Sequence, residues 1–277
     1  MNRIDKLFQD KKERVLNVYF TAGYPQLNDT TAILEALEAS GADLIEIGIP
    51  YSDPIADGPT IQESNGVALK NGMSLKVLFS QLKDIRDKVL VPIVLMGYVN
   101  PIEQFGMAAF CTKCEEVGVD GVILPDLPMF EYLELYKAMF EKHGLYNIFL
   151  ITPQTSETRI KQIDESSNGF IYMVSSASTT GAKTSITLDQ SDYFARVKNM
   201  NLKNPTLIGF GISSTETFDK ACENANGAII GSAFIKAIAG EGELKQKISG
   251  FVKSVIGWSG ISESVKELFL LEIRMNV

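Results

Sequence analysis

The stretch Asp43-Leu44-Ile45-Glu46-Ile47-Gly48 is a short, mostly apolar run that ends in glycine and precedes a helical pattern. Side chains alternate along a strand, so Ile45 and Ile47 share one face while Glu46 lies on the other. Apolar strands that alternate with helices form parallel sheets buried on both faces. The stretch therefore predicts one strand–helix unit, with the isoleucines facing a helix layer and Glu46 facing the interior near the carboxyl end of the strand.

The same unit recurs along the chain, which places eight strands and eight following helices in alternation. Strands are expected at residues 17–21, 43–48, 91–96, 121–124, 147–151, 169–174, 206–209 and 227–230. Helices are expected at residues 28–39, 61–86 with a break at 71–72, 101–116, 128–142, 155–165, 189–200, 214–222 and 232–239. Eight strand–helix pairs are the number that closes an α/β (β/α)8 TIM barrel.

The length of 277 residues fits either two ordinary domains or one α/β barrel. No linker or shift in composition divides the chain, so residues 1–277 are expected to form a single (β/α)8 barrel domain. Extra terminal helices are expected at residues 4–9 and 262–273. A doubly wound open sheet is the alternative, although no Gly-x-Gly-x-x-Gly motif follows the first strand.

Charge and composition exclude several classes of protein. Lys and Arg number 26 against 34 Asp and Glu, which gives a net charge of -8 and argues against nucleic-acid or anionic-membrane partners. The N-terminus is charged and lacks the apolar core of a secretory signal, and no run is long enough to span a membrane. Three cysteines are too few for a disulfide framework. A soluble cytoplasmic protein is expected.

Two features are interpreted as structural. Cys111 and Cys114 form a C-x-x-C motif, but they lie in a helical pattern without a second pair of metal ligands or a thioredoxin-like context. His143 is the single histidine, and it precedes Gly144 at the expected end of a helix, where the helix dipole favours it. No metal site is expected, because a His-rich metal site cannot be built from one histidine.

Catalytic residues of a (β/α)8 barrel lie at the carboxyl ends of its strands. A carboxylate such as Glu46 is costly there unless it has partners or a shifted pKa, and no expected strand carries the Lys or Arg that would pair with it. The loop that follows is unusually long and contains Asp53 and Asp57. A local capping role is favoured for Asp53, whereas a functional role is favoured for Asp57 because it accompanies Glu46.

Glycines at the ends of the last two expected strands indicate a phosphate site. Residues 209–214 read GFGISS and residues 231–233 read GSA, so bare backbone N–H groups and a helix N-terminus are available to an anion. The loop at residues 175–185 is small and polar, and it is either a surface linker or a lid that orders over substrate.

Five segments together resemble the family of tryptophan synthase alpha subunits over essentially the whole chain. They are Phe20-Thr21-Ala22-Gly23-Tyr24-Pro25, the segment 46–62 that reads EIGIPYSDPIADGPTIQ, and residues 118–123, 209–213 and 231–233. The resemblance implies a (β/α)8 barrel that cleaves indole-3-glycerol phosphate to indole and glyceraldehyde 3-phosphate in tryptophan biosynthesis.

The resemblance also implies roles for individual residues. Glu46 would be the general acid/base, and Asp57 would bind the indole N–H. The positions that match the phosphate site and its lid are Thr180, Gly181, Gly211, Gly231 and Ser232. The positions that match the indole pocket are Tyr19, Met96, Ile123, Leu150 and Tyr172, with Tyr98 near the entrance. The residues agree with the chemistry, since protonating indole C3 needs an acid and the resulting ring cation needs a carboxylate. Glu46 is expected to have an elevated pKa in its apolar surroundings.

The implied enzyme needs no cofactor, because pyridoxal phosphate belongs to the beta subunit of this family. The implied partner is that beta subunit, in an α2β2 heterotetramer, docked over the loops after the second and sixth strands with Asp53 and Pro54 near the contact. A stand-alone lyase and an inactive regulatory subunit are the alternatives, and the presence of both Glu46 and Asp57 disfavours the second. The lid departs from the familiar Arg-Ser-Gly-Val-Thr-Gly, since residues 176–181 read SASTTG.

Overall fold

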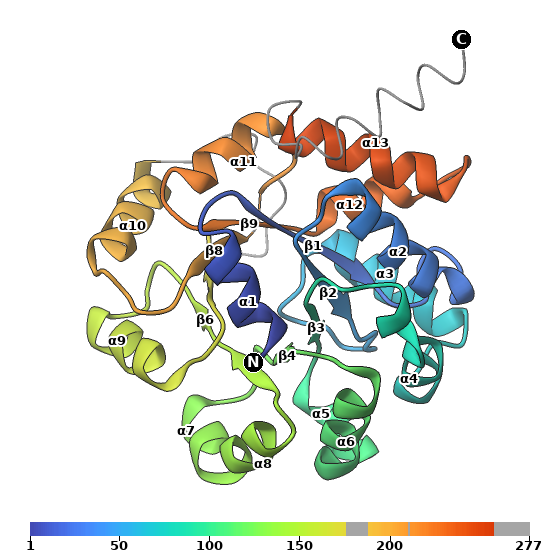
Figure 1. The fold of residues 1–277 in the computed structure, drawn as a ribbon, viewed down its shortest axis with the longest axis horizontal. Coiled ribbons are helices and arrows are strands. Elements are labelled where there is room, and N and C mark those ends of the chain that lie inside the picture. Colours follow the sequence, from blue (N-terminus) through green and yellow to red (C-terminus); the bar gives the residue numbers. More distant parts are fainter. Residues whose placement is uncertain (176–187, 210, 258–277) are drawn as a thin grey trace.

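A computed structural model describes residues 1–175, 188–209 and 211–257. Nine strands in these ranges form one sheet in the order β5-β4-β3-β2-β1-β9-β8-β7-β6, and all neighbouring pairs are parallel. The strands enclose an interior, and helices cover their outer side (Figure 1). The bounds are β1 Val15–Thr21, β2 Leu44–Gly48, β3 Ile93–Met96, β4 Gly121–Ile123, β5 Tyr146–Ile148, β6 Leu150–Ile151, β7 Ile171–Val174, β8 Thr206–Gly209 and β9 Gly227–Ile230.

The sheet closes into a ring through one short segment of chain. β5 pairs with β4, whereas β6 pairs with β7, and only Phe149 separates β5 from β6. The Phe149 ring packs against Tyr132 with centroids 5.3 Å apart, and the Phe149 carbonyl accepts a hydrogen bond from the Tyr172 N–H at 2.9 Å. The strand expected at 147–151 is therefore present as two pieces, and the expected α/β barrel of parallel strands is confirmed.

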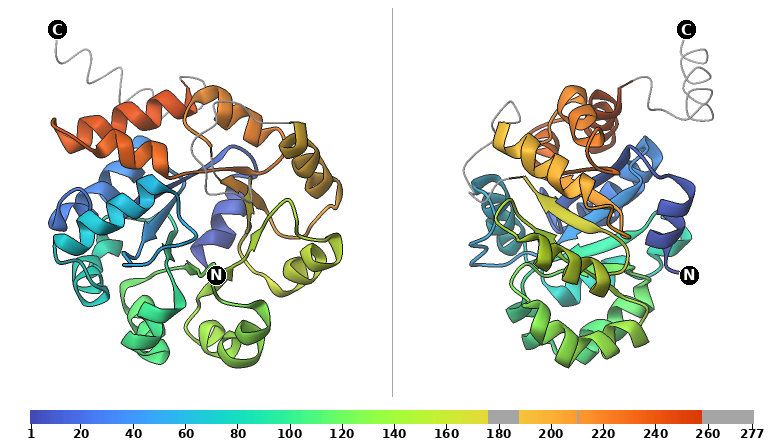
Figure 2. Two further views of the ribbon diagram at one scale, coloured as in Figure 1. Left: turned by 180° about the vertical axis from the view of Figure 1, so that it is seen from behind. Right: turned by 90° about the vertical axis from the view of Figure 1, so that its left-hand side faces the viewer.

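Helices form a ring around the strands, with α1 across one end of the barrel, as the view from behind shows (Figure 2). They are α1 Arg3–Asp10, α2 Thr30–Ser40, α3 Pro59–Lys70, α4 Leu75–Leu82, α5 Val99–Phe105, α6 Met107–Val117, α7 Met129–Glu131, α8 Lys137–Lys142, α9 Glu157–Ser166, α10 Leu188–Asn199, α11 Thr215–Cys222, α12 Ser232–Ile238 and α13 Leu244–Ile256. Short 3-10 turns occur at η1 Leu27–Asp29 and η2 Ile85–Asp87, and a π turn, η3 Tyr132–Tyr136, joins α7 to α8.

Three expected helices are interrupted. The helix expected at 61–86 ends at the expected break, and Ser74 caps the new helix by accepting from the Val77 N–H at 3.4 Å. The helix expected at 101–116 is divided at Gly106, whose φ of 94° is outside the helical region. The helix expected at 128–142 contains the π turn η3.

One helix was not expected, and one expected helix cannot be compared. α13 carries Ile248, Val252 and Val255 at the spacing of one helical face, and these residues are buried, so the pattern was available in the sequence. It packs against α2 at the outside of the barrel. The helix expected at 262–273 lies outside the described residues, and the single-domain extent of residues 1–277 stays a prediction.

The buried side chains divide between the inside and the outside of the barrel. Ile45 and Ile47 belong to the larger cluster, which lies between the strands and the helices. Leu44 belongs to the smaller cluster, which fills the barrel interior. The assignment of the two faces of β2 is therefore confirmed. α1 covers one end of the interior, where Phe8 packs on Phe170 with ring centroids 6.2 Å apart.

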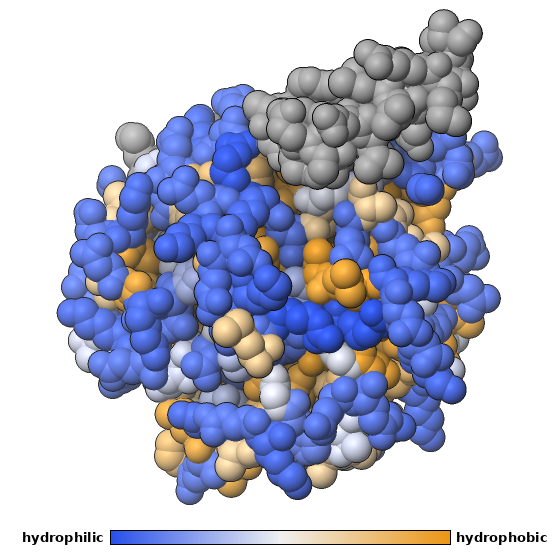
Figure 3. All heavy atoms as spheres, viewed as in Figure 1, coloured by the Kyte–Doolittle hydropathy of each residue, from blue (hydrophilic) through white to orange (hydrophobic). Residues whose placement is uncertain are grey.

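An ionic cluster ties α1 to the amino ends of the strands. Asp120 is buried just before β4 and pairs with Arg3 at 2.9 Å and with Arg86 at 2.6 Å. Its Oδ2 also accepts from the Ile93 N–H at 2.9 Å. The face of the barrel that carries α1 is mainly hydrophilic where the described residues form it (Figure 3). No helix in the described ranges is long and apolar enough to cross a membrane.

Candidate active site

Glu46 lies inside the barrel, in the middle of β2, and only 1% of its surface is exposed. Strand register places it beside Tyr19 of β1 and Val94 of β3. Its Oε2 accepts a hydrogen bond from the Asn17 amide at 3.0 Å. Its Oε1 is buried and has no hydrogen-bond partner among the described residues. One carboxyl oxygen is therefore anchored and the other is free.

The pKa of Glu46 is raised to about 8, chiefly by burial and to a lesser extent by the nearby charge of Asp57, while the hydrogen bond from Asn17 acts in the opposite direction. Desolvation is the main cause, because an ionised carboxylate loses its water when it is enclosed by apolar side chains. The expected elevation of the Glu46 pKa is confirmed. At neutral pH the group is predominantly a neutral carboxylic acid, so it is able to donate a proton.

Asp57 is half-buried in the loop after β2 and faces the same interior. The Tyr98 hydroxyl donates to Asp57 Oδ2 at 3.0 Å, and it accepts from the Ala56 N–H at 3.1 Å. The Gln62 side chain secures the loop by donating to the Asp57 carbonyl at 2.8 Å. Desolvation raises the pKa of Asp57 to about 6, although the Tyr98 hydrogen bond lowers it. Asp57 is therefore mostly ionised at pH 7 while Glu46 is mostly protonated.

Two buried tyrosines border the carboxyl pair. Burial raises the pKa of both Tyr19 and Tyr172, and the charges of Asp57 and Glu46 contribute, which places both rings close to the pair. A Cβ added at Gly48 would overlap the Tyr19 hydroxyl, and one added at Gly209 would overlap the Tyr172 hydroxyl. These two glycines therefore make room for aromatic rings, so an anion site is not required to explain Gly209.

The remaining residues expected in the indole pocket lie around the same space. Ile123 and Tyr172 belong to the interior cluster, and Met96 and Leu150 pack against it. Tyr98 lies at the loop beside Asp57 and its ring packs on Tyr51 with centroids 5.2 Å apart. The structure thus brings the two carboxyl groups and the expected apolar wall together. Their roles in binding substrate stay predictions.

The residues expected to bind phosphate are only partly described. Gly211 is exposed with a φ of 79°, Gly231 precedes α12, and Ser232 is its exposed first residue. A Cβ at Gly231 would lie 3.3 Å from the Tyr19 ring, so this glycine is adjacent to the pocket. Thr180 and Gly181, together with the rest of the expected lid at 176–185, lie outside the described residues.

The motifs interpreted as structural are found in structural surroundings. Cys111 and Cys114 are free and buried in α6, and burial raises the pKa of both thiols. His143 ends α8, and its Nδ1 lies 2.6 Å from Glu115 Oε2 on α6. Asp53 is exposed and accepts from the neighbouring Ser52 hydroxyl at 2.5 Å, which fits the local role favoured for it.

Asn17 is the residue that the sequence reasoning missed. It lies on the inward face of β1 with Tyr19 and contacts Glu46 directly. Alternation along the strand places Asn17 on the same face as Tyr19, but the register pairs Tyr19 with Glu46 and Asn17 with Leu44, so the contact of Asn17 with Glu46 is diagonal.

Comparisons with known proteins agree with this geometry. A family model described as tryptophan synthase alpha chain matches residues 6–257. The tryptophan synthase alpha chain of Flavobacterium psychrophilum is 57% identical over 255 residues, which cover 92% of this chain and 100% of the relative. The crystal structure of the alpha chain from Legionella pneumophila has a TM-score of 0.82 and 34% identity, covering 92% of this chain and 96% of that one.

A chain from the structure of tryptophan synthase from Mycobacterium tuberculosis has a TM-score of 0.81 and 28% identity, and the match covers 95% of this chain and 100% of that one. The family model, the sequence relative and the solved structures all extend over nearly the whole barrel. The chain therefore belongs to the tryptophan synthase alpha chain family, whose members are lyases of tryptophan biosynthesis.

Proposed function

We propose that Glu46 and Asp57 carry out the retro-aldol cleavage of indole-3-glycerol phosphate to indole and glyceraldehyde 3-phosphate. The observation that carries the proposal is the pair of carboxyl groups whose surroundings separate their pKa values, to about 8 for Glu46 and about 6 for Asp57. Two titratable groups set apart in this way supply one acid and one anion at neutral pH. The reaction needs both.

In the first step Glu46 donates its proton to indole C3. The ring becomes an indolenine cation with positive charge on its nitrogen, and the ionised Asp57 stabilises that charge through a hydrogen bond from the N–H. The buried surroundings strengthen this interaction, because little water is present to screen it. Tyr98 holds the Asp57 carboxylate in place through its hydrogen bond to Oδ2.

In the second step the newly formed Glu46 carboxylate takes the proton of the hydroxyl group next to the bond that breaks. The O–H electrons form the carbonyl of glyceraldehyde 3-phosphate, and the electrons of the breaking C–C bond return to the ring and neutralise its nitrogen. Glu46 is then protonated again, so the cycle balances in atoms, protons and electrons. The apolar wall holds the indole ring, and Gly211, Gly231 and Ser232 bind the phosphate together with Thr180 and Gly181.

The test is the rate of indole release by Glu46→Gln, which keeps the size of the side chain but has no proton to give. We expect it to fold and to lose about 100-fold to 10,000-fold in kcat, the usual contribution of general acid/base catalysis. Glu165→Gln, at an exposed position on α9, is the matched control and should keep full activity. Near-normal turnover by Glu46→Gln would remove Glu46 from the mechanism.

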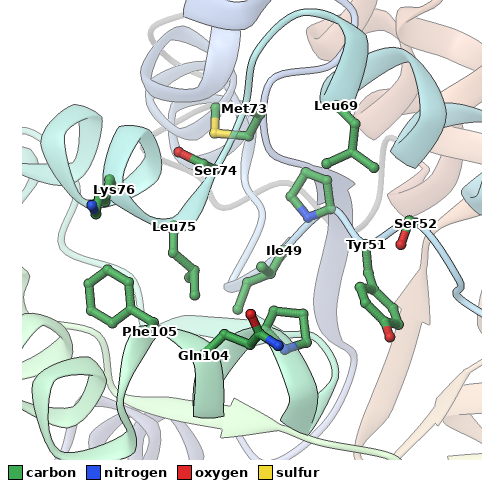
Figure 4. A pocket seen from close by; sticks show the side chains of 12 residues that line it. Ile49, Tyr51, Ser52, Leu69, Met73, Ser74, Leu75, Lys76, Gln104 and Phe105 are labelled. Atoms are coloured by element: carbon green, nitrogen blue, oxygen red, sulfur yellow. The ribbon is translucent and has the colours of Figure 1, made fainter.

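The partner proposed for this chain is a tryptophan synthase beta subunit, docked over the loops at the carboxyl ends of the strands. Two large apolar side chains are exposed at this end, Ile55 after β2 at 84% and Phe130 after β4 at 72%. A cavity of about 400 Å³ lies beside the loop that carries Ile55. Its walls are formed by Tyr51, by the turn before α4 and by α5 (Figure 4). Exposed apolar surface beside a cavity is typical of a protein interface. Asp53 and Pro54 lie in the same loop.

Docking is tested with purified beta subunit from a related organism. Ile55→Ser should weaken the complex in a sedimentation titration by about tenfold, whereas Leu90→Ser should have no effect, because Leu90 is 73% exposed but precedes β3 at the opposite end. Indole release with and without the beta subunit distinguishes the alternative. Full activity alone, with no complex formed, would favour a stand-alone lyase.

A further inference from the structure

Asn17 is a fully buried amide in β1, a strand in which every residue is buried. It is in register with Leu44, one inward-facing layer below the pair of Tyr19 and Glu46. Its Nδ2 donates to Glu46 Oε2, but its Oδ1 is buried without a partner in the described part of the chain. A buried polar atom without a partner is unfavourable, so packing alone does not explain the amide.

The direction of this hydrogen bond restricts where the Glu46 proton can be. In a neutral carboxyl group the carbonyl oxygen accepts an amide N–H more strongly than the hydroxyl oxygen does, so the amide favours the oxygen that carries no hydrogen. With Nδ2 held 3.0 Å from Oε2, the proton of the neutral acid therefore occupies Oε1, the oxygen that has no partner among the described residues. The bond comes from the layer below Glu46, away from the carboxyl ends of the strands, so the oxygen it leaves free is the one available to a substrate in the mouth of the barrel.

We propose that Asn17 is a positioning residue, which fixes the rotation of the Glu46 carboxyl group and keeps its exchangeable proton on Oε1, facing the substrate. This inference rests on the proposed acid/base role of Glu46. Asn17 itself does not need to touch the substrate. Its contribution should therefore affect the chemical step more than substrate binding.

A pH dependence follows from the same contact. The titratable groups that interact with Glu46 are Asp57 from the loop after β2, Tyr19 from β1 and Tyr172 from β7. Among the described contacts, the Asn17 amide is the one that favours the ionised form of Glu46. Removing it raises the Glu46 pKa, so the loss of activity at alkaline pH should move to higher pH by about one unit.

The test compares Asn17→Leu with the unchanged protein. Leucine has nearly the same shape as asparagine but makes no hydrogen bond, so the carboxyl group can rotate and its proton can occupy either oxygen. We expect kcat at pH 7 to fall about tenfold with KM unchanged, and the alkaline limb of kcat against pH to move upward by about one unit. Asn17→Ala removes the same polar atoms without adding any, and it replaces the leucine variant if that one does not fold.

Asn147→Leu is the matched control. Asn147 is also a buried strand asparagine with an unpaired Oδ1, but its neighbours Tyr146 and Ile148 face the interior, so it faces the helix layer. Its substitution should leave kcat and the alkaline limb unchanged. An unshifted limb and unchanged kcat in the Asn17 variants would overturn the inference. Glu46→Gln is measured in the same experiment to separate the two claims. If Glu46→Gln is inactive while the Asn17 variants are unaffected, only the role of Asn17 is overturned. If Glu46→Gln is active, the proposed function itself is overturned.

Discussion

The Glu46→Gln variant should be more stable than the unchanged protein, and the difference in their free energies of unfolding should grow as the pH rises. Burial raises the Glu46 pKa from its ordinary value of 4.5 to about 8, so the folded state holds this proton more tightly than the unfolded state does. Below pH 4.5 both states are protonated and the group contributes no difference. Between pH 4.5 and 8 the unfolded state ionises first, and the folded state becomes progressively less stable as the pH rises.

The size of the effect follows from the two pKa values. At about 1.4 kcal/mol per pH unit, the native carboxyl group weakens the fold by about 3 kcal/mol at pH 7 and by about 5 kcal/mol above pH 8. The glutamine side chain cannot ionise, so the Glu46→Gln variant escapes this loss.

Urea unfolding followed by circular dichroism at pH 5, 6, 7, 8 and 9 measures the difference between Glu46→Gln and the unchanged protein. The free energies of unfolding should diverge with pH and then run parallel above pH 8. Glu165→Gln, at an exposed position, should show no such divergence. Curves for Glu46→Gln that stay parallel to the unchanged protein from pH 5 to 9 would refute the reasoning, because Glu46 would then titrate as an ordinary carboxyl group.

Three other predictions concern the site and the opposite end of the barrel. Asp57→Asn should lower kcat/KM for indole release about 10-fold to 100-fold, since it removes the charge in a hydrogen bond worth about 1.5–3 kcal/mol; equal kcat/KM would contradict this. Tyr98→Phe removes a bond that lowers the Asp57 pKa, so the acidic limb of kcat/KM should move above pH 6; an unmoved limb would count against the contact. Asp120→Ala leaves the partly buried Arg86 without its carboxylate partner and should lower the free energy of unfolding by about 3–5 kcal/mol in urea, with kcat unchanged; equal stability would refute it.

The repeating strand–helix pattern predicted the barrel because its period is a local property of the sequence. The apolar runs located all the strands, and the alternation along β2 correctly placed Glu46 inside. The break at Phe149 was not predictable in the same way, since it depends on how the first and last halves of the ring meet. The helix α13 was missed although Ile248, Val252 and Val255 have helical spacing.

The sequence predicted those site residues whose side chains are themselves reactive, and it did not predict those whose role depends on a contact with another strand. Glu46 stood out because a carboxylate is rare on the inward face of a buried strand, and Asp57 stood out because it lies in the unusually long loop that follows. Asn17 did not stand out, because its contact with Glu46 depends on the register between β1 and β2, which the sequence does not specify. Gly48 had no evident reason in the sequence and Gly209 was interpreted as part of a phosphate site, whereas the structure explains both by the hydroxyl groups of Tyr19 and Tyr172.

The most direct test of the central claim is kcat/KM for indole release measured from pH 5 to 10. With Glu46 as the acid and Asp57 as the anion, we expect a bell-shaped curve, which rises as Asp57 ionises near pH 6 and falls as Glu46 loses its proton near pH 8. Activity that stays level or increases between pH 7 and 9.5 would contradict it, because the acid that protonates indole C3 would then not be Glu46.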